Sequence, residues 1–157
     1  MTFTPDIIEK IVIAVFGAAV GSVGTFVGVL IKNYFDSKAL RRNELRGRVT
    51  KIEELIRHAE DDAIEYWRKD PGAAEFHELE VSIKKLRKQI GHEISHLDKA
   101  GFPCVEASSE AIVNFNFAIS GDDFEVKNRA AQPFRHERIS SAANGLIDIL
   151  RDALKLI

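Results

Sequence analysis

The amino-acid sequence predicts an all-α protein, in which one N-terminal transmembrane helix is followed by an antiparallel bundle of about four helices. The segment 11–31 has 21 residues and no charge, and a helix needs about 20 such residues to cross a bilayer. Farther along the chain, apolar residues recur at intervals of three and four, which indicates amphipathic helices. No segment alternates strand-forming residues with polar ones, so we expect no sheet.

The segment 11–31 is expected to cross the membrane once. A buried core helix is rarely apolar on all sides over such a length. A cleaved signal peptide is the alternative, but its apolar region has about 7–15 residues and follows a basic leader. Here the leader contains Asp6, Glu9 and Lys10 and has no basic excess. We therefore interpret 1–10 as an extracytoplasmic tail and 11–31 as a retained transmembrane helix.

The charges beside this segment predict its orientation. The basic juxtamembrane segment 32–51 has seven Lys and Arg residues against two acidic ones, a net charge of +5. Positive charge next to a span stays on the cytoplasmic side, so we expect a cytoplasmic helical domain over 38–157, at the inner (plasma) membrane. Each such cation near an anionic leaflet contributes about 1 kcal/mol to binding. The cations expected at the lipid surface are Lys32, Lys38, Arg41, Arg42, Arg46 and Arg48.

Small residues within 11–31 follow the helical repeat. Five of them recur at alternating intervals of three and four, which places them on one stripe of a helix. Such a stripe lets two helix backbones approach closely, and packing drives helix association in lipid. We therefore expect a homo-oligomer, with a different partner transmembrane helix as the alternative. The stripe consists of Ala14, Gly17, Gly21, Gly24 and Gly28.

Four helices are expected in the soluble domain, over 38–70, 73–99, 105–119 and 134–156, with a polar loop over 121–133. Proline and glycine at 71–72 and 101–103 separate the first three. The first of these helices either continues from the span or restarts at a cap on Asp36 or Ser37.

One apolar face of each helix is expected to form the core. The spacing along the first helix is that of a coiled coil. The predicted core positions are Leu45, Val49, Ile52, Ile56, Ala59, Ala63 and Tyr66 in the first helix; Phe76, Leu79, Ile83, Leu86, Ile90 and Leu97 in the second, with Glu93 and Ile94 between the last two; Ile112, Phe115 and Ile119 in the third; and Ile139, Ala143, Leu146, Leu150 and Leu154 in the fourth.

The motif with the clearest chemistry is HEISH at 92–96. On a helix its two histidines lie one turn apart on one side, where both can bind zinc while the glutamate activates a water. These five residues resemble the zincin metalloprotease motif. The resemblance implies His92 and His96 as zinc ligands and Glu93 as the general base.

A zinc site needs a third ligand, and Glu106 and Glu110 are the available carboxylates. Neither lies in a second signature of that family, and no strand is expected that would align a substrate. We therefore interpret HEISH as polar helix surface with Glu93 at the bundle seam. No cofactor, metal ligand or catalytic residue is assigned, and zinc is kept as the alternative.

Composition and charge argue against nucleic acid as a partner and against a disulfide within the chain. The 157 residues carry a net charge of −2, so bulk charge favours no nucleic acid. One cysteine excludes a disulfide within the chain, which is typical of a reducing compartment. A basic patch of the kind that contacts phosphate, Lys84, Lys85, Arg87 and Lys88, is interpreted as a solvated or paired helix face.

These features predict a non-enzymatic, single-pass, membrane-anchored helical module. It would self-associate and act as a scaffold, sensor or tether at the inner membrane face, with the bilayer and a cytosolic protein as partners. The first alternative is an oligomeric membrane-perturbing or pore-forming effector, for example in bacterial defence against phage. The second is a membrane-bound zinc metalloprotease that uses residues 92–96.

Overall fold

The computed structural model divides the chain into two compact units, 1–42 and 43–157. The structure describes the backbone of 5–69, 75–103, 105–121, 123–126 and 130–156, and the side chains of 32–69, 76–103, 108–121, 123–126 and 130–156.

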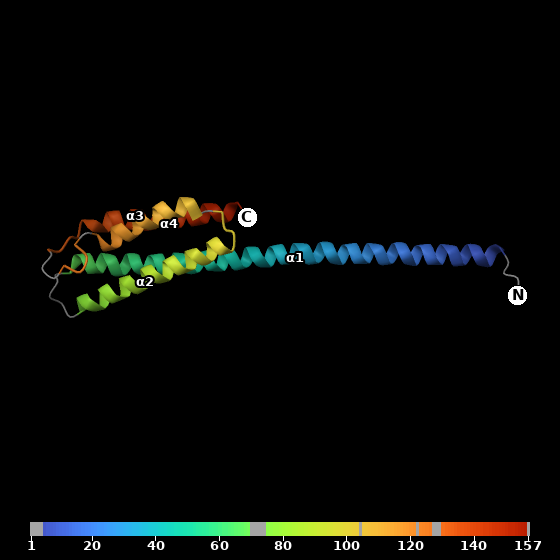
Figure 1. Cartoon of the computed structure of the whole chain (residues 1–157), viewed down its shortest axis with the longest axis horizontal. Helices are drawn as coiled ribbons and strands as arrows, with labels where there is room; N and C mark the ends of the chain where they lie inside the picture. The colour runs from blue at the N-terminus through green and yellow to red at the C-terminus, as the bar shows by residue number, and fades with distance from the viewer. Residues whose placement is uncertain (1–4, 70–74, 104, 122, 127–129, 157) are drawn as a thin grey trace. The chain divides into compact units, whose positions relative to one another are not determined.

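Four helices and no strand make up the described residues (Figure 1). They are α1 (Pro5–Arg68), α2 (Glu75–Lys99), α3 (Val105–Ser120) and α4 (Arg135–Lys155). The all-α prediction is therefore confirmed. The bounds expected for α2, α3 and α4 agree with the structure to within two residues at each end, because proline, glycine and polar residues mark those ends.

The helix α1 is continuous from Pro5 to Arg68. No new helix therefore begins at Asp36 or Ser37. The predicted tail 1–10, the predicted span 11–31 and its glycine stripe lie outside the residues whose side chains are described. Among the described residues, no helix has the length and apolar character needed to cross a membrane.

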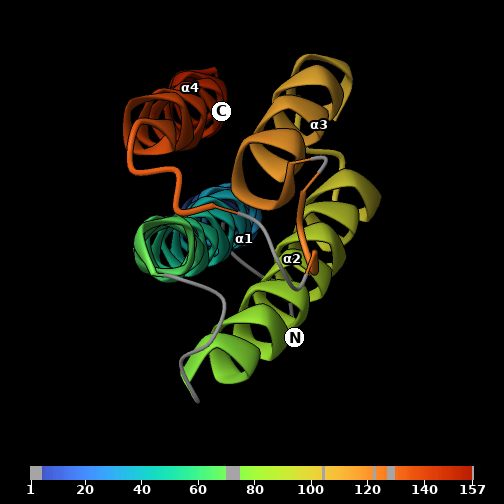
Figure 2. The ribbon, with the colours of Figure 1, turned by 90° about the vertical axis from the view of Figure 1, so that its left-hand side faces the viewer.

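The unit 43–157 is a four-helix bundle. The chain direction reverses from each helix to the next (Figure 1), and the end-on view shows the helices around a common centre (Figure 2). Polar contacts connect α1 to each of the others. Lys51 pairs with Glu93 of α2, Trp67 donates a hydrogen bond to the Ile119 carbonyl of α3, and Arg151 of α4 pairs with Glu53.

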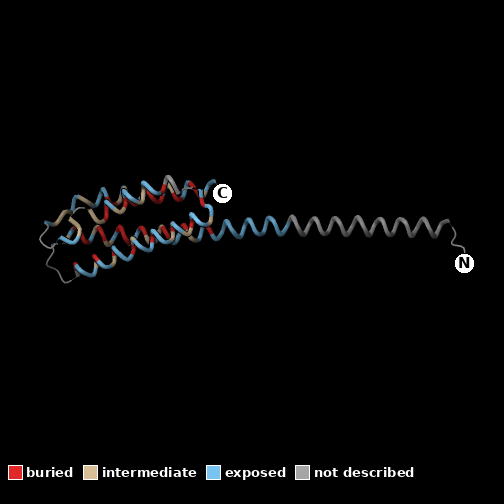
Figure 3. Tube along the Cα trace, viewed as in Figure 1, coloured by how far each residue is buried: buried red, intermediate tan, exposed pale blue. Residues whose placement is uncertain are grey.

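The core occupies the inward faces of the helices, as the buried positions in Figure 3 show. All seven predicted core residues of α1 are buried. Leu79, Ile112 and Leu154 are only partly buried and pack at the edge of the core. Further buried residues that the predicted stripes did not include are Trp67, Phe102, Ala118, Ile147 and Ala153.

An aromatic cluster closes the core beyond Ala63. The Tyr66 ring stacks on Phe76 at 4.4 Å between centroids and lies 5.0 Å from Phe124. The Tyr66 hydroxyl accepts a hydrogen bond from the Glu125 amide at 3.0 Å and donates one to Glu80 at 3.3 Å. The loop that contains Phe124 and Glu125 is thereby attached to the bundle.

Candidate functional site

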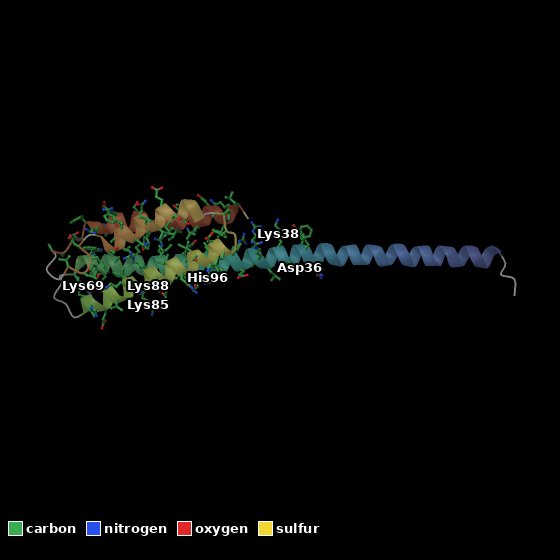
Figure 4. The ribbon with its side chains drawn as sticks, in the orientation of Figure 1. Asp36, Lys38, Lys69, Lys85, Lys88 and His96 are labelled. Carbon is green, nitrogen blue, oxygen red and sulfur yellow. The ribbon has the colours of Figure 1, made fainter. Side chains whose placement is uncertain are left out.

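The side of α2 that packs into the core determines where the polar residues of this helix lie. The buried residues Ile83, Leu86, Ile90, Ile94 and Leu97 fix the rotation of this helix about its own axis. Basic residues and histidines then lie on its remaining sides. Figure 4 labels Lys85, Lys88 and His96 along the helix.

Glu93 lies at the contact between α1 and α2. Its Oε1 is 2.6 Å from Lys51 Nζ, and its Oε2 is 3.8 Å from a terminal nitrogen of Arg48. The side chain is only 12% exposed. The hydrogen bond from Lys51 lowers the pKa of Glu93 against the opposing effect of burial, and the charges of Lys51, Arg48 and His96 lower it further.

This environment suits an ion pair better than a general base. A base for water activation needs a pKa near the working pH and a free path to the water. The Glu93 carboxylate is instead held as an anion by two cations of α1. The arrangement joins the two helices electrostatically.

The histidines of HEISH contact each other. The Nε2 atoms of His92 and His96 are 3.2 Å apart, and their rings meet edge to face at 4.4 Å between centroids. In the neutral pair, one ring donates the hydrogen bond and the other accepts it. Two nitrogens at this spacing can share a metal ion, but a structural or catalytic zinc needs a third protein ligand.

No third ligand completes this pair within the described residues. The structure places no group of three His, Cys, Asp or Glu side chains there that could hold a metal ion. Glu110, one of the two carboxylates considered, lines a groove between α3 and α4 with Asn114 and Ser141. The side chain of Glu106, the other carboxylate, lies outside the described residues.

The basic segment 32–51 divides into two parts. The cations from Lys32 to Arg46 are exposed, so they are accessible to an anionic surface. Arg48 instead lies 3.1 Å from Glu44 and also faces Glu93, to which Lys51 is hydrogen bonded. Arg48, expected at the lipid surface, is therefore engaged in contacts within the protein.

Sequence reasoning did not identify Lys51 as the partner of Glu93. A signal was present, because Lys51 precedes the core residue Ile52 and Glu93 precedes the core residue Ile94. Residues that flank core positions of adjacent helices are placed to pair across the seam, as in coiled coils. The sequence does not show how far α1 is shifted along its axis relative to α2, and the pairing depends on that shift.

Comparisons with protein families, with curated proteins and with solved structures find no match. The arrangement comprises a closed bundle, exposed cations that precede it, a paired glutamate, and a histidine pair that lacks a third ligand in the described part of the chain.

Proposed function

We propose that this protein is a single-pass, membrane-anchored helical module that self-associates through a glycine stripe. It acts as a scaffold, sensor or tether at the inner membrane face. The observation that carries the proposal is the order of three features: the uncharged segment 11–31, the cation-rich segment 32–51, and a bundle that buries its own apolar residues. A bundle that buries its apolar residues against one another does not need lipid to cover them.

The exposed cations support the proposed orientation. Lys32, Lys38, Arg42 and Arg46 are exposed and precede most of the core residues of α1. Lysine and arginine beside a span favour the cytoplasmic side and add affinity for an anionic leaflet. This side of the membrane would be the one on which the bundle meets its partners.

The glycine stripe supports self-association. Four glycines and Ala14 share one face of an ideal helix over 14–28. In lipid, where apolar surface gains nothing by burial, close backbone packing of such faces drives helices together. A stripe on each copy is self-complementary, so a second copy of this chain is the simplest partner.

Light scattering of the full chain in mild detergent tests this proposal. Gly21→Leu adds a bulky side chain to the stripe, and Ala19→Leu adds nearly as much bulk on the opposite side of an ideal helix. We expect a discrete oligomer for the parent chain and for Ala19→Leu, and a monomer for Gly21→Leu. A monomeric parent chain, or equal loss of the oligomer in both variants, would contradict self-association through the stripe.

The oligomer number also tests a second function, that of a pore-forming effector. One span per chain can line a pore only in a ring of several copies, and Ser22 and Thr25 are hydroxyl residues within the segment 11–31 that a pore could expose. A large ring should collapse the membrane potential on induced expression, and Gly21→Leu should prevent the collapse. A dimer would exclude the pore and leave the anchored scaffold.

A further inference from the structure

A polar pocket lies between α2 and α3. It is lined by Lys84, Arg87 and Lys88 of α2 and by Asn116 of α3, and its volume is about 360 Å³. The three cations share one side of α2 because they are spaced by three and four residues. The described residues that line this pocket are all polar or charged.

Arg87 is oriented within the pocket by Asn116. Its Nε donates a hydrogen bond to Asn116 Oδ1 at 3.1 Å. Arginine can only donate, so this bond fixes the amide with its oxygen toward Arg87 and leaves the amide nitrogen as a donor. Within the described residues, no other contact engages the terminal nitrogens of this guanidinium.

The charge of the pocket is not fully balanced. Lys84 pairs with Glu125 of the following loop. Lys88 is exposed and forms no ion pair with any described residue. Two cations, Arg87 and Lys88, thus remain without a carboxylate partner in the described part of the chain.

Gly91 is the next position of α2 on the side that carries the pocket cations. This residue lies one turn beyond Arg87 and three residues beyond Lys88, on the same side of α2. A Cβ placed at Gly91 would meet nothing within 4 Å. Access to the cations is therefore not blocked by a side chain at this position.

We propose that this pocket binds the phosphate group of a phosphorylated ligand. A guanidinium presents its donors in a planar fork that matches two phosphate oxygens, while the ammonium of Lys88 supplies a compact charge. The amide nitrogen of Asn116 supplies a further donor. The inference goes beyond the proposed function, because it uses only α2 and α3 and needs neither anchoring nor self-association.

Titration calorimetry of the full chain in non-ionic detergent tests this site. The probes are inorganic pyrophosphate for a soluble source and a short-chain phosphatidic acid for a lipid headgroup. Arg87→Gln should weaken binding by about tenfold or more, since charge-assisted bonds are lost. Lys85→Gln, an equal change of charge on α2 outside the pocket, should leave the affinity unchanged.

A second variant tests the site without altering any lining residue. Gly91→Asp places a carboxylate one turn from Arg87 on the same side of α2, and its repulsion should also weaken binding by about tenfold. Saturable binding of pyrophosphate would identify a soluble phosphorylated ligand, and binding of phosphatidic acid alone would identify a lipid headgroup. Absence of binding by both probes at millimolar concentration, or equal weakening by Lys85→Gln, would overturn the proposal.

Discussion

The two ends of the bundle are closed by different means. At the entry end, formed by 45–56 of α1 with 90–97 of α2, the core is aliphatic and the seam holds the Lys51–Glu93 ion pair. At the aromatic end, formed by 63–67 of α1 with 76–83 of α2, rings fill the core and carry buried hydrogen bonds. The same spacing of apolar residues thus gives an aliphatic core with an ion pair at one end of the bundle and an aromatic core at the other.

The difference predicts two responses to solution conditions. An ion pair depends on protonation and is screened by salt where it is exposed. The packing of aromatic rings carries no net charge, so it depends little on protonation or on salt. Acid and salt should therefore loosen the entry end first, whereas truncation of a side chain should cost most at the aromatic end.

Trp67→Ala should have the largest effect. The indole is 1% exposed, donates to the Ile119 carbonyl at 2.9 Å, and lies 3.9 Å beneath the Arg135 guanidinium. Its removal should lower the free energy of unfolding by about 3–5 kcal/mol. Because this is the only tryptophan, urea unfolding should be followed by circular dichroism.

Val113→Ala is the control for this truncation, since Val113 is 66% exposed on α3. Its effect should stay within about 0.5 kcal/mol. Similar losses in the two variants would show that Trp67 does not anchor the aromatic end.

Tyr66→Phe should have an intermediate effect. It keeps the ring but removes the hydroxyl, which accepts a hydrogen bond from the Glu125 amide and donates one to the buried Glu80. Leaving those groups without this partner should cost about 1–2 kcal/mol. Tyr34→Phe changes the other tyrosine, which is 67% exposed, and should be neutral when both are measured by tryptophan fluorescence.

Glu93→Gln tests the entry end and should have the smallest effect, about 1 kcal/mol near neutral pH. The folded-state pKa of Glu93 lies below its usual value of 4.5. Its carboxylate therefore stabilises the fold above that value, and the contribution is lost as the pH falls through the lowered pKa. The parent chain and the variant should converge in acid.

Glu54→Gln is the control for this titration, because Glu54 is exposed on α1. It should leave both the stability and its pH dependence unchanged. If Glu93→Gln and the parent chain remained equally stable at neutral pH, the ion pair would contribute nothing to the entry end.

The sequence predicted most of the fold through one signal. Apolar spacing of three and four fixes which face of each helix turns inward, and all seven core positions expected in α1 are buried. Proline and glycine marked the breaks that end α1 and α2. Trp67 was outside the predicted stripe, and its partners, the Ile119 carbonyl of α3 and the Arg135 guanidinium of α4, come from distant parts of the chain.

Contacts between polar residues were less accessible to prediction. Periodicity fixes the rotation of a helix about its axis, but not how far it is shifted along its neighbour. The pairing of Lys51 with Glu93, and of Arg87 with Asn116, depends on that shift. The anchor 11–31 and the glycine stripe stay predictions, because their side chains lie outside the described residues.

Alkaline carbonate extraction of membranes from cells that express the full chain tests the central claim most directly. Alkaline carbonate releases proteins held at a membrane surface by charge, whereas a chain anchored by an apolar span of about 20 residues stays in the lipid. We predict that the chain stays in the membrane pellet. Complete release into the supernatant would contradict a transmembrane anchor at 11–31.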